Sequence, residues 1–176
     1  ATLSGGHLIG ANLEDADVGG DDLRAAELEG AYLGGADLPG AHLIGANLKG
    51  ADFVGADLRG ADLTGAHLKG ANLEGAYLEG VNLRGADLEG AYLEGANLRG
   101  AHLNAANPAD AHILGAHLRG ADLECANPDG ANLLSAHPIA SNPLAADAEP
   151  THLHAADIHA ATLAPTHPPP QPATHL

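Results

Sequence analysis

The segment Ala46-Asn47-Leu48-Lys49-Gly50 and its copies run with almost no interruption from residue 26 to residue 100. Every fifth residue is Leu or a close substitute, and the residue two positions earlier is Ala. The residue between them is usually Asp, Asn, His or Tyr, and a Gly usually closes the unit. The Leu slot has 35 members between Leu3 and Ala173, of which 28, including the first 21, are Leu, Ile, Val or Phe. One five-residue unit in a single register therefore builds the chain.

A period of five residues excludes both an α-helix and a long strand. On a helix with about 3.6 residues per turn, the leucines would spiral around the axis without forming a stripe. On a continuous strand, an odd spacing would send successive leucines to opposite faces. The pattern fits a short extended side followed by a corner: Ala and Leu point inward, the polar residue between them points outward, and Gly relieves the steric limit at the bend.

Four such sides close a square, so we predict an all-β, quadrilateral parallel β-helix. Each coil takes four five-residue units, and successive coils stack at the parallel-strand spacing of about 4.8 Å, so roughly eight coils give a rod roughly 40 Å tall. Leu28, Leu48, Leu68 and Leu88 form one predicted core ladder, and Phe53 belongs to a neighbouring one. We expect the β-helix to cover residues 1–165 and the Pro-rich residues 166–176 to form a tail or cap.

Units such as Ala56-Asp57-Leu58-Arg59-Gly60 and Ala71-Asn72-Leu73-Glu74-Gly75 follow the pattern A-(D/N)-L-x-G. This pattern resembles the pentapeptide repeat proteins, and the resemblance covers nearly the whole chain. It implies a right-handed quadrilateral β-helix with the Leu and the preceding Ala inside. Some members of that family bind DNA gyrase in place of DNA and so blunt fluoroquinolones. The resemblance therefore implies DNA mimicry as one function for an acidic rod.

Composition limits the classes of partner. The formal net charge is -16 at pH 7, and the sequence pI is about 4.8. Direct binding of nucleic acid through phosphate contacts needs clustered Lys and Arg and is not expected. No run of about 18 apolar residues predicts a membrane span, and no charged-then-apolar leader precedes the repeats, so we expect a soluble protein. The single Cys125 leaves the compartment open, with the cytoplasm favoured.

Outward residues 20 apart become vertical neighbours in such a fold. Asp17, Asp37 and Asp57 then form an acidic column, which Tyr77 and Asn97 continue. Like charges at this spacing repel by a few tenths to about 1 kcal/mol for each exposed pair, so their presence indicates either a function or a role in solubility. The candidate partner-binding set comprises Asp17, Asp37, Asp57, Asp52 and Asp62.

The basic residues of the repeat follow the Leu, where they alternate with acidic ones. Lys49 and Lys69 are expected between Glu29 and Glu89, while Arg59 and Arg99 are expected on either side of Glu79. We interpret these residues as compensating ion pairs rather than as a binding patch. Asp21 occupies an Ala slot, where a buried carboxylate would be costly. We expect a local distortion of the corner that turns it outward; a functional buried acid is the alternative.

Histidine is abundant, with 12 copies. Nine occupy the outward slot: His7, His42, His67, His102, His112, His117, His137, His152 and His167. A metal site needs ligands that converge on one point, whereas a flat ladder splays side chains apart, so no metal site is predicted. Full protonation would change the net charge from -16 to -4, because -16 + 12 = -4. Acidification near pH 6.5 should therefore erode any function of a negative surface.

No catalytic motif accompanies the repeats. The sequence lacks a phosphate-binding glycine loop, a G-x-S-x-G turn and an H-E-x-x-H pattern, and no cofactor is expected. We therefore predict a non-enzymatic structural or protein-interaction module with an acidic rod-like surface and an unknown partner. The alternatives are a DNA-mimicking binder of DNA gyrase, and an engineered or idealised rod, which the missing Met and unbroken register suggest. An end-to-end dimer is compatible with a rod of this kind.

Overall fold

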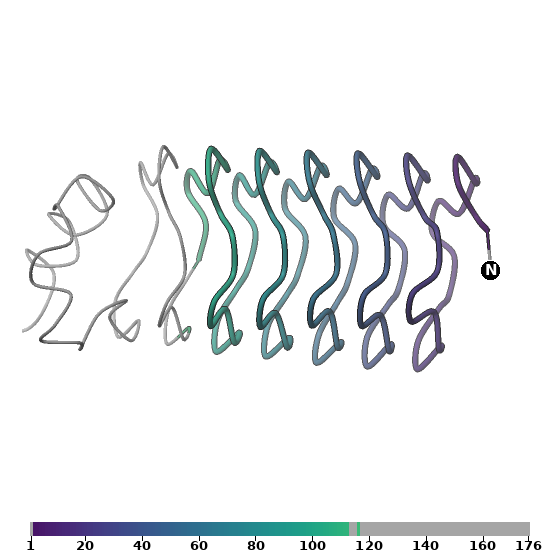
Figure 1. The fold of residues 1–176 in the computed structure, drawn as a ribbon, viewed down its shortest axis with the longest axis horizontal. Coiled ribbons are helices and arrows are strands. Elements are labelled where there is room, and N and C mark those ends of the chain that lie inside the picture. Colours follow the sequence, from purple (N-terminus) through teal and green to yellow (C-terminus); the bar gives the residue numbers. More distant parts are fainter. Residues whose placement is uncertain (1, 113–115, 117–176) are drawn as a thin grey trace, which may run out of the picture.

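The computed structural model describes residues 2–112 and 116, in which the chain forms a regular stack of coils (Figure 1). Each five-residue unit has one residue that pairs with neighbouring coils, followed two positions later by a two-residue turn. Every bridge is parallel and joins residues 20 apart, from Thr2 and Asp22 to Tyr92 and His112. These bridges are single-residue pairings rather than longer strands. The structure therefore has the four-sided, 20-residue coil predicted from the sequence.

We name each side by its first bridged residue. The Thr2 side carries Thr2, Asp22, His42, Asp62, Asn82 and His102, and the His7 side carries His7, Glu27, Asn47, His67, Asp87 and Asn107. The Asn12 side carries Asn12, Tyr32, Asp52, Asn72, Tyr92 and His112, and the Asp17 side carries Asp17, Asp37, Asp57, Tyr77 and Asn97. The corner after each side consists of the two residues that follow the Leu slot.

Backbone hydrogen bonds explain how one unit holds its neighbours. The Leu48 amide donates to the His67 carbonyl at 2.7 Å, and the Gly50 amide donates to the Lys69 carbonyl at 3.0 Å, both on the next coil. The Asn47 amide donates to a carbonyl of the preceding coil. The corner closes when the Ala51 amide donates to the Leu48 carbonyl at 3.1 Å. The amide of the residue after Leu is the one donor in the unit that no backbone carbonyl accepts.

Glycine is required at the corner because of its backbone conformation. Gly50 has φ 62°, and glycines at the same position of other units have closely similar positive values. A four-residue turn with a positive φ only at its third residue is type II, which favours Gly there. Pro39 occupies the second position of one such turn, where its fixed φ is suitable. Among the described residues, four that are not glycine adopt the positive φ: Asp15, Ala25, Ala105 and Asp110.

The interior is a stack of leucine and alanine layers. Leu28, Leu48, Leu68 and Leu88 are fully buried, as is Phe53. Among the described residues, no polar or charged residue is buried. Leu3, Leu8 and Leu13 of the first coil are only partly buried and pack against the core. Burial therefore becomes complete from the second coil onward.

The structure corrects one local expectation. The corner before Asp21 is regular, because its amide donates to the Val18 carbonyl at 3.1 Å and its carbonyl accepts from the His42 amide at 2.9 Å. Asp21 is half-buried next to the incompletely covered first coil. The backbone is therefore not distorted there. This slot therefore holds a partly exposed carboxylate without a bent corner.

Other expectations lie partly outside the described residues. Pro108 occupies the Leu slot and is buried, and its carbonyl accepts the corner bond from the Ala111 amide at 2.9 Å. A type II corner therefore forms with Pro in that slot. Pro128, the continuation of the β-helix to residue 165 and the tail at 166–176 lie outside the described residues. None of the described residues forms a helix that could cross a bilayer.

Candidate interaction surface

The acidic column runs along one side of the rod. Asp17 bridges to Asp37, Asp37 bridges to Asp57, and Tyr77 and Asn97 follow on the next two coils. Asp17 and Asp37 are exposed, whereas Asp57 is partly covered. The three carboxylates therefore lie on successive coils of the same side. They form one line of negative charge along the rod.

The other two candidate acids do not join that line. Asp52 bridges to Tyr32 and Asn72 on the Asn12 side, while Asp62 bridges to His42 and Asn82 on the Thr2 side. These two sides are opposite each other in a four-sided coil. A single flat partner surface on the Asp17 side cannot contact both acids. Proximity in sequence is misleading here, because each step of five residues turns the chain by one side.

The outward Asp and Asn side chains accept a hydrogen bond within their own corner, which the sequence pattern did not predict. The Asn47 side-chain oxygen accepts the Lys49 amide at 3.4 Å, and the Asp52 carboxylate accepts the Val54 amide at 3.0 Å. Twelve of the thirteen described Asp and Asn residues in this slot make the same bond to the residue two positions later. The bond satisfies the one amide of the unit that no backbone carbonyl accepts.

Asp37 is the exception among these thirteen residues, and the reason is chemical. The residue two positions after it is Pro39, which has no amide hydrogen to donate. The Asp37 carboxylate is exposed and makes no hydrogen bond within the described part of the chain. It lies between Asp17 and Asp57, both of which are engaged by their own corners. Asp37 thus lacks the corner bond of its two neighbours, and its charge interacts with that of Arg59.

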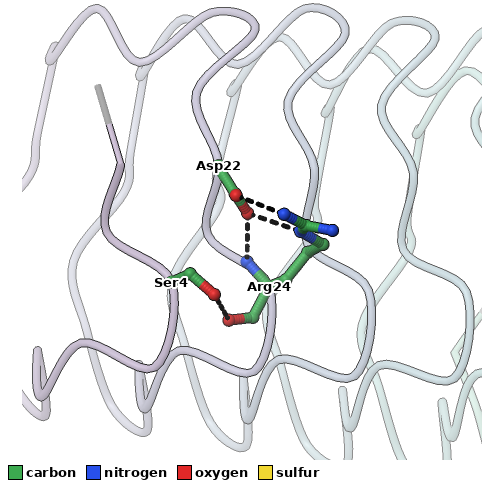
Figure 2. A network of polar contacts seen from close by, with 3 residues as sticks. All are labelled: Ser4, Asp22 and Arg24. Atoms are coloured by element: carbon green, nitrogen blue, oxygen red, sulfur yellow. Dashed lines mark hydrogen bonds and ion pairs between the residues drawn. The ribbon is translucent and has the colours of Figure 1, made fainter.

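Two of the outward acids also hold an arginine of their own corner. The Asp22 carboxylate accepts hydrogen bonds from the Arg24 amide at 3.2 Å, from Nε at 2.8 Å and from Nη2 at 2.6 Å (Figure 2). The Ser4 hydroxyl of the preceding coil donates to the Arg24 carbonyl at 3.1 Å. Asp57 and Arg59 repeat the arrangement, with Nε donating at 2.9 Å. In each Asp-Leu-Arg sequence, the carboxylate therefore binds the guanidinium of its own corner through two side-chain hydrogen bonds.

These pairs change the proton affinity of the carboxyl groups. Hydrogen bonds from the Arg24 side chain, with a smaller contribution from its backbone amide, lower the pKa of Asp22 to about 2. The Arg59 side chain lowers the pKa of Asp57 in the same way. Both acids therefore stay ionised, and both are engaged by a cation of the chain itself. This engagement makes Asp57 a weaker candidate for partner binding than Asp37.

Comparisons with known proteins agree with the coil geometry. The family model "Pentapeptide repeats" matches residues 26–65 and 66–104 with eight copies. HetL, a pentapeptide repeat protein involved in heterocyst differentiation regulation from the cyanobacterium Nostoc sp. strain PCC 7120, is 30% identical. That alignment covers 80% of this chain and 78% of HetL, with a TM-score of 0.47. The chain belongs to the pentapeptide repeat family.

Two further pentapeptide repeat structures are similar. The protein alr5209 from Nostoc PCC 7120 is 42% identical over 49% of this chain and 69% of its own, with a TM-score of 0.46. A trypsin-treated form of QnrB1, a plasmid-mediated fluoroquinolone resistance protein, is 19% identical over 72% and 76%, with a TM-score of 0.53. At that identity the likeness to QnrB1 shows the shared fold alone. A comparison with curated proteins gave no significant match.

The ion pairs of this pentapeptide repeat rod differ in part from expectation. Lys69 Nζ lies 3.1 Å from Glu89 Oε1, so that predicted pair is present. Arg59, however, pairs with Asp57 of its own coil rather than with Glu79, whose Oε1 instead accepts a hydrogen bond from Asn97 at 2.6 Å. A carboxylate two residues away reaches the guanidinium without bridging two coils.

The histidines of the described repeats show one ordered arrangement. The His112 ring stacks on the Tyr92 ring with centroids 4.8 Å apart and an interplanar angle of 9°. His112 Nδ1 lies 4.0 Å from Glu94 Oε1. Within residues 2–112 and 116, no group of three or more His, Cys, Asp or Glu residues could hold a metal ion. His117, His137 and Cys125 lie outside the described residues.

The hydrogen-bonded Asp22–Arg24 pair predicts a pH dependence of stability. The pKa of Asp22 is lowered from 3.8 to about 2 on folding, so its stabilising contribution is complete above pH 3.8 and is lost as the pH falls through about 2. We expect the Tm of Asp22→Asn to fall less than that of the wild type over this range, because Asn keeps the corner bond but cannot be protonated. Asp17→Asn, with no arginine two residues on, should keep the wild-type slope. Parallel Tm curves for wild type and Asp22→Asn would contradict this account.

Proposed function

We propose that the chain is a non-enzymatic protein-interaction module, carried on a right-handed quadrilateral β-helix, whose acidic Asp17 side binds a partner with a positively charged surface. Support comes from the stacking of Asp17, Asp37 and Asp57 on successive coils. Asn makes the same corner bond elsewhere in the rod, for example at Asn72 with 3.1 Å to the Glu74 amide. The corner bond therefore needs an oxygen acceptor at this slot but does not need a charge.

The charge of the column has a cost that Asn would avoid. Carboxylates on adjacent coils repel by a few tenths to about 1 kcal/mol for each pair. Asp37 is the clearest case, because Pro39 deprives it of the corner bond and leaves only its charge. A line of surplus negative charge on a rigid rod attracts and orients a cationic partner. Binding, rather than folding, accounts for this part of the sequence.

A charge-only substitution tests the proposal. In the triple variant Asp17→Asn, Asp37→Asn, Asp57→Asn, the corner acceptors remain while three charges are removed. The matched control is Asp22→Asn, Asp62→Asn, Asp87→Asn, which changes the net charge equally on the Thr2 and His7 sides. Used as baits in quantitative pull-downs from extract of the source organism, wild type and control should retain the same partner, and the Asp17-side variant should lose it. Equal retention by all three baits would contradict the proposal.

The second candidate is binding of DNA gyrase in place of DNA. Regularly spaced carboxylates along one side of the rod favour it, and the fold shared with QnrB1 makes it testable. We expect wild-type protein at micromolar concentration to protect gyrase supercoiling from a quinolone, and the Asp17-side triple variant to lose this protection. Absence of both inhibition and protection would remove gyrase as the partner. The broader proposal of a cationic protein partner would remain testable by the pull-down.

A further inference from the structure

One corner of the rod differs from the other three in its charge. Among the described residues, the corner after the Thr2 side carries Arg24 and Arg84, the corner after the His7 side carries Lys49 and Lys69, and the corner after the Asp17 side carries Arg59 and Arg99. The corner after the Asn12 side carries no Lys or Arg in this range. It carries Glu14, Asp15, Val54, Glu74 and Glu94 instead, which we call the Glu14 edge.

The acids of the Glu14 edge have no basic side chain to neutralise them. Within the described part of the chain, the ion pairs of Lys and Arg side chains are Arg24 with Asp22, Arg59 with Asp57 and Lys69 with Glu89. All three lie away from this edge. Glu94 approaches only His112, at 4.0 Å. Among the described residues, the edge therefore carries acids on the first, fourth and fifth coils and no Lys or Arg, whereas the corners after the His7 and Asp17 sides carry both signs.

All three tyrosines of the chain lie on the two sides that meet at this edge. Tyr32 and Tyr92 are on the Asn12 side and Tyr77 is on the Asp17 side, with exposed fractions of 51%, 41% and 51%. Val54 on the edge itself is 41% exposed. Exposed tyrosines supply large contact area at low conformational cost and are enriched at binding interfaces.

These tyrosines also lack the corner hydrogen bond that Asp and Asn make at the same position. At the same slot, Asp and Asn accept the amide two residues later, as Asn97 does from Arg99 at 3.3 Å. A Tyr side chain has no oxygen near enough to its own corner to do this. Three of the eleven described outward slots on these two sides therefore hold a tyrosine, which cannot make the corner bond. The tyrosines and the acids of the Glu14 edge therefore lie on adjoining parts of the rod surface.

We propose that the Glu14 edge, with Tyr32, Tyr77 and Tyr92 beside it, is a docking surface for an arginine-rich protein segment. This inference rests on the proposed function and names the chemistry of the partner. The exposed carboxylates of Glu14 and Glu74 can each accept the two parallel hydrogen bonds of a guanidinium, whereas Glu94, whose Oε2 is buried, adds charge alone. The exposed rings of Tyr32 and Tyr77 stack on the same planar group, while Tyr92 already stacks on His112. A lysine ammonium, a more strongly hydrated point charge, uses the rings less well.

A peptide-binding experiment on the full chain tests the inference. The probe is a fluorescein-labelled oligoarginine peptide, with an oligolysine peptide of equal length as comparison, and the readout is fluorescence anisotropy at physiological salt. We expect oligoarginine to bind more tightly. Glu14→Gln, Glu74→Gln, Glu94→Gln should weaken its binding about tenfold, since three charge contacts, two of them exposed, together contribute on that order. The matched control Glu29→Gln, Glu79→Gln, Glu89→Gln removes as many charges from the corners after the His7 and Asp17 sides and should have little effect.

A second variant separates the aromatic contribution from charge. Tyr32→Asn, Tyr77→Asn, Tyr92→Asn installs the residue that the corner favours, so it should fold at least as well as wild type. We expect it to lose about tenfold in oligoarginine affinity and to lose the preference for arginine over lysine. Equal weakening by the edge and control glutamine variants, or an unchanged arginine preference in the tyrosine variant, would overturn the inference.

Two further outcomes would contradict the proposed docking surface. Absence of oligoarginine binding, or a dimer in sedimentation that the edge substitutions dissociate, would show that the edge does not dock an arginine-rich segment. The pull-down with Asp17-side variants can still succeed in either case. A partner whose retention depends on Asp37 but not on the Glu14 edge would support the proposed function and reject this inference.

Discussion

Leu48→Ala should destabilise the protein by about 2 to 5 kcal/mol, the usual range for a well-packed interior leucine. Leu48 is fully buried in the ladder that also contains Leu28 and Leu68. Its removal leaves a cavity between rigid coils that the repeated hydrogen bonds hold at fixed spacing. Urea unfolding followed by circular dichroism measures the loss as a lower midpoint.

Leu8→Ala is the matched control for this substitution. Leu8 occupies the same ladder but is only partly buried, because it lies in the first coil. Less contact is lost there and the end coil can adjust, so we expect a clearly smaller effect than at Leu48. Equal effects at both positions would show that the ladder does not set the stability of the coil, as would a loss below about 1 kcal/mol at Leu48.

Gly50→Ala should destabilise the protein by about 1 to 2 kcal/mol through the backbone alone. Gly50 has φ 62°, and a Cβ added there would meet nothing within 4 Å. The cost is therefore conformational, without a steric clash against another residue. Ala25 has φ 53° at the same position of another unit, so Ala25→Gly should stabilise the protein by up to about 1 kcal/mol.

A neighbouring glycine supplies the control for the corner prediction. Gly34 precedes the positive-φ residue of its corner, has no positive φ itself, and an added Cβ would meet only the Val54 carbonyl oxygen at 3.7 Å. Gly34→Ala should therefore be neutral or slightly stabilising. Thermal and urea unfolding of the three variants should give opposite signs for Gly50→Ala and Ala25→Gly. The same sign for both would contradict the assigned corner geometry.

The sequence was sufficient to predict the coil because the five-residue period has few physical solutions. Neither a helix nor a strand keeps Leu43, Leu48 and Phe53, which are five residues apart, on one face, so four sides and four corners were the remaining arrangement. The stacking of Asp17, Asp37 and Asp57 followed from the same arithmetic. Columns are predictable in this fold because each residue has its neighbours 20 positions away.

The details of the surface were harder to predict because they depend on side-chain reach. Residue order alone did not show that Asp57 would hold Arg59 across its own corner rather than leave it to Glu79. The sequence pattern also does not show that the recurrent Asp and Asn side chains accept the amide two residues later, which no backbone carbonyl accepts. Pro39 then explains why Asp37 differs from its neighbours. Asp52 and Asp62 were grouped with the column because they are close in sequence, although their sides are opposite.

Cross-linking across one predicted coil contact tests the central claim most directly. With Cys125 replaced by Ser, the pair Asn47→Cys and His67→Cys places two thiols on bridged residues of adjacent coils. The pair Asn47→Cys and Asp62→Cys is closer in sequence but lies on different sides. A fluorogenic thiol reagent that spans a few ångströms should link the first pair rapidly and the second scarcely. Rapid linking of the second pair, or none of the first, would contradict the four-sided coil.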